Sequence, residues 1–244
     1  MTAGAPGFFG KVSTHGDFVT RALPPELVQG WDDWLQQAMH ASGQQLGGAW
    51  LALYLTSPVW RFALADGVLG EDGWAGVMMP SVDRVGRHFP LMIAAPLVKG
   101  TALTALMAEG TDWFDAIEDA ARATLAADFA LECLAPLLAA LAPMKAGPGP
   151  VCEAGRAGWR FAAAARDPGM VTLAEALLHG HSLWWSEGGP NVTPSVLACK
   201  GMPDAQAFAA MLDGRWREHG WGTVRAPAAA QEAALAGPAS SVRA

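Results

Sequence analysis

Two short apolar segments that enclose a cluster of polar residues lie in the first half of the chain, and they constrain its fold most. Residues 73–79 and 91–97 are continuously apolar and have prolines at their borders, which is typical of strands buried on both faces. The polar segment between them, termed the polar island, is Pro80–Pro90 and carries Ser81, Asp83, Arg84, Arg87 and His88. The pattern predicts two core strands joined by a charged loop.

The charges of the polar island require partners, because an unpaired buried charge is costly. Asp83 can pair with Arg84 or Arg87, since a planar guanidinium binds a carboxylate through two hydrogen bonds. The same geometry suits a structural clamp inside the protein and a grip on an acidic group of a partner. Both uses are open from the sequence, and the structural one is the more common.

Arg61 and the adjacent pair Trp184 and Trp185 are further candidates. Arg61 lies in WRFAL, a segment with the aromatic content of a strand, and we expect it to pair with Asp83 or Asp17 if this strand adjoins the two core strands. Neighbouring tryptophans in a strand point to opposite faces, so both can be core residues, the more common case, or one can contact a partner. The full set of candidates for a partner contact or a structural clamp is Asp17, Arg61, Ser81, Asp83, Arg84, Arg87, Trp184 and Trp185.

No arrangement typical of an enzyme is present in the sequence. Ser13, Thr14, His15 and Asp17 crowd one turn, but the members of a catalytic triad usually converge from different segments. The sequence contains no nucleophile elbow, no phosphate-binding glycine loop and no dinucleotide-binding fingerprint. We therefore expect no catalytic residues and no cofactor.

A metal site is not expected either. His179 and His181 are two residues apart and lack an accompanying acidic motif such as HExxH. Cys133, Cys152 and Cys199 are odd in number and widely spaced, which favours reduced thiols over a disulfide framework or a zinc site.

Composition narrows the class of protein further. The chain has 244 residues, of which 52% are hydrophobic, so a large core is expected. The net charge of −7 argues against nucleic acid and anionic lipid as partners. The sequence shows no secretory signal pattern, and the most apolar long window, residues 129–144, contains Glu132 and Pro136 and is shorter than the roughly 20 residues of a membrane helix. We expect a soluble, cytoplasmic protein without membrane insertion.

Helical and strand-like patterns alternate along the chain, which favours an α/β fold with a central sheet covered by helices. The expected strands, beside the two core strands, are a short one within 7–19 and those at 60–64, 158–163, 182–186 and 194–199. One expected helix begins at Pro24–Pro25 and has an apolar face formed by Leu27, Trp31, Trp34, Leu35 and Ala38. Another begins at the cap Thr111 and has an apolar stripe formed by Phe114, Ile117, Ala121 and Leu125. Further helices are expected to begin at Trp50, at Asp128 with a kink or break at Pro136, at Thr172 and at the cap Asp204. One domain over residues 1–222 is expected, with a loop or linker at 143–150 and a poorly ordered alanine-rich tail at 223–244.

Five segments of the chain are distinctive: GFFGKVSTHGDFV (7–19), LTSPVWRFAL (55–64), PSVDRVGRHFPL (80–91), HSLWWSEGG (181–189) and MPDAQAFAAMLDGRW (202–216). Together they resemble the TagF family, also called ImpM, which is associated with bacterial type VI secretion. They follow one another in the order of the family over most of the chain, although His15 and His88 differ from the residues more usual there. The resemblance implies a three-layer α/β/α sandwich, and we expect its central sheet to be mixed.

The resemblance also implies a function. TagF-like proteins are cytoplasmic accessory factors that restrain type VI secretion after translation by engaging its forkhead-associated (FHA) scaffold protein. They act in a threonine-phosphorylation route without being its kinase or phosphatase. A non-enzymatic repressor that works by protein contact is thus expected, and the sequence leaves its oligomeric state open. The alternative is a hydrolase or small-ligand-binding protein with a polar site at residues 81–88, if these residues, Arg61, Asp17 and His15 converge on an open cavity.

Overall fold

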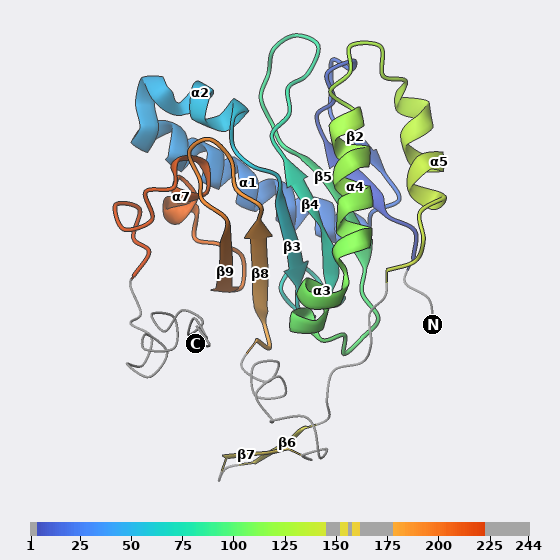
Figure 1. Ribbon diagram of the computed structural model, residues 1–244, viewed down its shortest axis with the longest axis vertical. Helices are drawn as coiled ribbons and strands as arrows, with labels where there is room; N and C mark the ends of the chain where they lie inside the picture. The colour runs from blue at the N-terminus through green and yellow to red at the C-terminus, as the bar shows by residue number, and fades with distance from the viewer. Residues whose placement is uncertain (1–3, 145–151, 156–157, 162–177, 223–244) are drawn as a thin grey trace, which may run out of the picture.

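A seven-stranded antiparallel sheet forms the centre of the computed structural model, which describes residues 4–144, 152–155, 158–161 and 178–222 (Figure 1). Its strand order is β2-β1-β5-β4-β3-β8-β9. The strands are β1 (Gly7–Gly10), β2 (Val19–Arg21), β3 (Trp60–Leu64), β4 (Trp74–Met79), β5 (Leu91–Pro96), β8 (His181–Ser186) and β9 (Ser195–Lys200). Strands β6 (Cys152–Gly155) and β7 (Gly158–Phe161) form a separate antiparallel pair.

The prediction of a mixed sheet is wrong, because every pair of neighbouring strands in the seven-stranded sheet is antiparallel. The physical reason lies in the connections. Only residues 65–73 separate β3 from β4, and only residues 80–90 separate β4 from β5. A parallel crossover needs a dozen or more residues, usually with a helix, so segments this short return as hairpins.

Helices cover both faces of the sheet (Figure 1), which confirms the α/β class. On one face lies α1 (Pro25–Leu46), with α2 (Trp50–Leu55) and α7 (Ala210–Asp213) near it; on the other lie α3 (Leu103–Glu109), α4 (Thr111–Ala123) and α5 (Leu134–Ala139). Short 3-10 turns are formed by η1 (Gly47–Ala49), η2 (Leu131–Cys133) and η3 (Ala205–Ala207). Among the described helices, none combines the length and the hydropathy needed to cross a membrane.

Alternation along each strand divides the core into two halves. In β3, Phe62 packs in the cluster under α1, whereas Ala63 packs in the cluster under α4. Trp184 and Trp185 of β8 divide in the same way, as expected for neighbours in a strand, and both are buried. Because both faces of the sheet are covered at its centre, β4 and β5 have no polar face and their sequences are continuously apolar.

Most expected helices form, with shifts at their ends. Helix α1 starts directly after Pro24 and buries the expected apolar face. Thr111 is the first residue of α4 and makes no capping hydrogen bond, and Leu125 lies beyond the helix with 49% of its surface exposed. Helix α5 starts at Leu134 rather than at Asp128, so Pro136 falls in its first turn, where proline is tolerated.

The last expected helix is shorter than predicted. Asp204 does cap a turn, because its carboxylate accepts a hydrogen bond from the Gln206 N–H at 2.7 Å, but that turn is η3 and the helix proper is only α7. Of the expected strand at 158–163, residues 158–161 form β7, and residues 162–163 lie outside the described residues. The expected linker at 143–150, the helix from Thr172 and the tail at 223–244 fall wholly or mainly outside the described residues.

Candidate functional site

The antiparallel topology brings the polar island to one end of the sheet together with two other segments. The loop of residues 11–18 follows β1, the polar island follows β4, and α2 precedes β3. Strands β1 and β4 run in one direction and β3 in the other, so all three segments meet at the same end (Figure 1).

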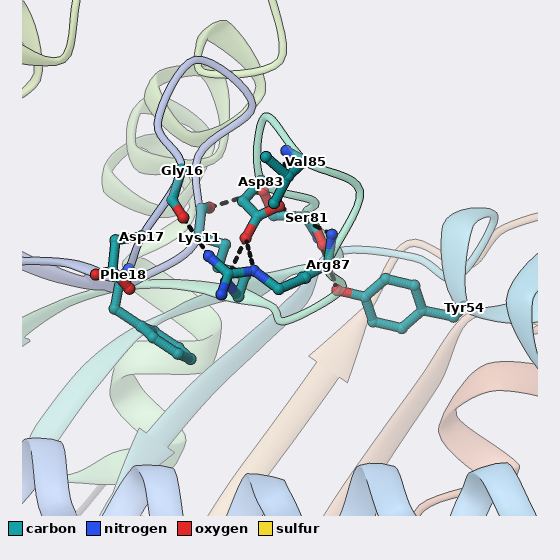
Figure 2. A network of polar contacts seen from close by, with 9 residues as sticks. All are labelled: Lys11, Gly16, Asp17, Phe18, Tyr54, Ser81, Asp83, Val85 and Arg87. Carbon is teal, nitrogen blue, oxygen red and sulfur yellow. Dashed lines mark hydrogen bonds and ion pairs between the residues drawn. The ribbon is translucent and has the colours of Figure 1, made fainter.

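Asp83 is at the centre of a network of polar contacts (Figure 2), and its carboxylate is buried. Lys11 Nζ contacts Asp83 Oδ2 at 2.5 Å, and Arg87 Nε donates to the same oxygen at 2.7 Å. The backbone N–H groups of Val85 and Arg87 donate to Oδ1 at 3.0 and 2.9 Å. Burial alone would raise the pKa of Asp83, but the hydrogen bonds from Lys11, Arg87 and Val85 outweigh it and hold that pKa well below its usual value. Asp83 is therefore an ionised carboxylate with both oxygens occupied.

This network ties two loops together. The Arg87 guanidinium also donates to the carbonyl oxygen of Gly16, and the Arg84 N–H donates to the carbonyl oxygen of His15 at 2.9 Å. The expected pairing of Asp83 with Arg87 is confirmed. The Arg84 side chain is instead exposed and forms no ion pair with the described residues.

Tyr54 fastens α2 to the start of the polar island. Its hydroxyl donates to the Ser81 carbonyl at 2.7 Å and accepts from the Ser81 N–H at 2.9 Å. The Ser81 hydroxyl donates to the Lys11 carbonyl at 2.7 Å, so it is engaged by backbone rather than by a base. Burial raises the pKa of Tyr54 above its usual value. The His88 ring packs edge-on against Tyr54 and Trp50.

Arg61 belongs to a different network on the face covered by α4. Its Nε donates to Glu118 Oε1 and its Nη2 to Asp115 Oδ1, each at 2.6 Å. Arg122 Nη2 donates to the second oxygen of Glu118, also at 2.6 Å. The expected pairing of Arg61 with Asp83 or Asp17 is therefore wrong, because alternation along β3 directs Arg61 toward α4, whereas Asp83 lies in the loop beyond β4.

The remaining candidates divide into exposed and buried residues. Asp17 is exposed, and its carboxylate accepts a hydrogen bond from the Phe18 N–H at 2.9 Å. Trp184 packs against Trp31, Trp34 and Phe62, and Trp185 packs edge-on against Phe114. Both tryptophans are core residues in this fold, so neither is available at the surface.

A third ionic cluster lies near the end of the described chain, at residues 213–219. Asp213 is buried, and its Oδ2 accepts hydrogen bonds from Arg215 Nε at 2.7 Å and pairs with His219 Nε2 at 2.8 Å. Burial alone would raise the pKa of Asp213, but hydrogen bonds from Arg215 and His219 lower it. His219 also contacts Gln45 of α1 at 2.9 Å, so this cluster joins the end of the described chain to α1.

Among the described residues, the side chains considered for a polar site do not line a common cavity. A cavity of about 420 Å³ lies at the edge strand β2, and its lining contains none of residues 81–88; the lining residues are Phe8, Phe18, Val19, Thr20, Arg21, Leu131, Glu132 and Ala135. Arg61 is on the α4 face, Asp83 is enclosed by its own loop, and Asp17 points to solvent. Within the described residues, no cluster of His, Cys, Asp and Glu is arranged to hold a metal ion.

Sequence reasoning missed Lys11, Tyr54 and Glu118, each of which is buried and central to a network. A signal existed for Glu118, because it lies four residues after Phe114 and three before Ala121, on the apolar stripe of α4. Lys11 stands between apolar residues and next to Gly10, which suits a buried cation, but nothing in its surroundings in the sequence indicates Asp83 as its partner.

Comparisons with known proteins agree with this architecture. The family model described as the TagF N-terminal domain, type VI secretion system-associated, matches residues 7–141. The crystal structure of PA0076 from Pseudomonas aeruginosa PAO1 is similar to this protein with a TM-score of 0.82 and 36% sequence identity, and the similarity covers 91% of this chain and 98% of that chain. No curated protein matches the chain. Since the family model spans more than half of the sequence, this protein belongs to the TagF family of type VI secretion system-associated proteins.

Proposed function

We propose that this protein is a non-enzymatic, cytoplasmic regulator of a type VI secretion system that represses secretion after translation by binding the FHA-domain scaffold protein. Membership of the TagF family supports the link to the secretion system. The three-layer α/β/α arrangement that the resemblance implies is part of the same proposal, and the helices on both faces of the sheet support it.

The state of the Asp83 carboxylate is the observation that most favours contact over catalysis. A general base needs a free lone pair and a pKa near the working pH. Asp83 has two cations and two backbone N–H groups on its oxygens, and its pKa is lowered. Ser81 has no base beside its hydroxyl, which donates to a backbone carbonyl. These contacts support a role in protein contact over the alternative of a hydrolase or small-ligand site at residues 81–88.

The mechanism that fits such a protein is stoichiometric. The folded domain occupies its scaffold and biases assembly of the secretion system toward the inactive state. That bias requires a higher affinity for one state of the scaffold than for the other, since equal affinity shifts nothing.

Calorimetry with the purified chain and the FHA scaffold encoded with it tests this proposal. The titration is carried out with phosphorylated and with unphosphorylated scaffold. Saturable binding with different affinities for the two forms is expected. Absence of binding to both forms would overturn the proposal.

A further inference from the structure

We infer that the end of the sheet that carries the polar island is a preformed docking surface for a protein partner that presents apolar side chains flanked by carboxylates. This surface, termed the loop end, comprises residues 11–18, α2 with residues 56–59, residues 80–90, the turn at 124–130 and the loop at 187–194. The inference rests on the proposed function for the identity of the partner, and it adds where the contact is made.

Topology places these five segments together. Strands β1, β4 and β8 run toward this end, so the segments that follow them lie there, and β3 runs away from it, so the segment before β3 does too. The Ser13 hydroxyl donates to the Thr124 carbonyl at 2.9 Å, which places the end of α4 beside the first loop. Figure 1 shows α2, the β4–β5 loop and the turn after α4 at the same end of the molecule.

Exposed apolar side chains concentrate in the segments of the loop end. Seven large hydrophobic residues are exposed in the described part of the chain, and five of them belong to these segments: Phe18, Leu51, Leu55, Val85 and Leu125. The other two, Leu137 and Val196, lie on α5 and on the edge strand β9. The Phe18 ring points away from the polar island (Figure 2) and packs against Phe9 and Phe89, so Leu51, Leu55, Val85 and Leu125 carry the argument. Single exposed apolar residues are normal on any surface, whereas a gathering of most of them at one end marks a contact site.

The charges at the centre of this surface favour an acidic partner. Residues 11–18, α2 and the polar island carry the cations Lys11, Arg84 and Arg87 against the carboxylates Asp17 and Asp83, in a chain with a net charge of −7. Asp83 is buried and already paired, so the exposed charge of the polar island is that of Arg84 and Arg87. The flanking loops carry Asp128 and Glu187, so the basic part is confined to the polar island. Val85, 66% exposed, lies between the two arginines in sequence.

The loop end is also held in one shape. Beside the Lys11–Asp83–Arg87 and Tyr54–Ser81 contacts, the Asn191 side chain donates to the Thr56 hydroxyl at 3.1 Å, so each of its five segments is fastened to a neighbour. A preformed surface loses less conformational entropy on binding. Its width across the sheet is adequate, because six spacings of about 4.8 Å between the seven strands give about 29 Å, close to the side of a square patch of about 800 Å².

Matched substitutions on two surfaces test the inference by calorimetry with the FHA scaffold as the probe. The loop-end variants are Arg84→Glu, Val85→Ser and, on α2, Leu55→Ser. The controls on β9 are Lys200→Glu and Val196→Ser, which reproduce the charge and the exposure of the first two, since Val196 is 61% exposed and Lys200 is exposed. Each of these side chains is at the surface, so every variant is expected to fold, and circular dichroism and thermal unfolding check this.

We expect the loop-end variants to weaken binding at least about tenfold and the β9 variants to change it less than about twofold. Wild-type binding should also weaken with added salt, and Arg84→Glu should reduce that salt dependence. Wild-type binding that the loop-end variants retain would overturn this inference and leave the proposed function intact. Absence of binding by the wild type to either form of the scaffold would overturn the proposed function, and the inference with it.

Discussion

Replacing Arg61 with methionine tests the charge network that joins β3 to α4. Arg61 is 5% exposed and Glu118 is 4% exposed, and their side chains join β3 to α4 through a contact of 2.6 Å. Methionine fills much of the volume of arginine without its charge. The substitution therefore leaves the Glu118 carboxylate buried with Arg122 as its remaining cation among the described residues.

The expected loss of stability follows from this geometry. Removing one partner of a buried ion pair costs about 3–5 kcal/mol, because the other charge is left without compensation. Two features reduce that figure here: Arg122 still binds Oε2 of Glu118, and the Asp115 side chain is 57% exposed and can be hydrated. We expect Arg61→Met to lower the free energy of unfolding by about 2–4 kcal/mol.

A double variant removes the charges of both Arg61 and Glu118. In Arg61→Met with Glu118→Leu, no buried charge remains at this contact, and the double variant should come within about 1 kcal/mol of the wild type or exceed it. The measurement is urea unfolding at neutral pH, followed by tryptophan fluorescence. A single variant as stable as the wild type, or a double variant no more stable than the single one, would show that the pair does not act as a coupled buried charge pair.

Three further predictions concern single sites, and each is measured by urea or thermal unfolding. Tyr54→Phe should lower stability by about 1–3 kcal/mol, because the lost hydroxyl serves both the N–H and the carbonyl of buried Ser81; an unchanged stability would mean that water replaces it. Asp83 has a lowered pKa in the folded protein, so its ionised carboxylate adds to the free energy of unfolding above its unfolded pKa of about 3.9, and this stabilisation is lost as the pH falls toward the folded pKa. Asp83→Asn should therefore be less stable than the wild type at pH 7, and the difference in stability should disappear in acid. Gly76→Ala should strongly lower the free energy of unfolding, because the added Cβ would lie 2.1 Å from the Ile93 carbonyl oxygen. As a control, Gly43→Ala in α1 places its Cβ within 4 Å of no other atom and should raise the free energy of unfolding by about 0.5–1 kcal/mol. Equal effects of the two substitutions would contradict the packing of β4 on β5.

Local patterns allowed much of the fold to be predicted. The apolar segments at 73–79 and 91–97 are β4 and β5, and α1 begins after the expected proline. These features depend on a few neighbouring residues. The direction of the strands was missed because a strand buried on both faces loses its alternation and reads alike in parallel and antiparallel sheets. The nine and eleven residues that connect β3, β4 and β5 carried the missing information, since they leave no room for a crossover helix.

The candidate site was predictable only where its contacts are local. Asp83 and Arg87 are four residues apart, and their pairing could be inferred from the sequence. Lys11 and Asp83 are 72 positions apart, and Arg61 and Glu118 are 57 apart. Those contacts depend on strand order, on register and on which face each side chain takes, and no pattern within a single segment encodes these.

The polar island thus divides its residues between two tasks. Ser81, Asp83 and the backbone of Arg87 set the shape of the loop from inside, and their side chains or N–H groups are fully engaged. Arg84 and Val85 lie at the turn that these internal hydrogen bonds hold in place, and their side chains are exposed to solvent. A substitution at Asp83 would alter the loop and any contact made by it together, so loss of binding would not show which was affected. Substitutions of the side chains of Arg84 and Val85 leave the internal hydrogen bonds in place, so within the polar island they separate the contact from the fold.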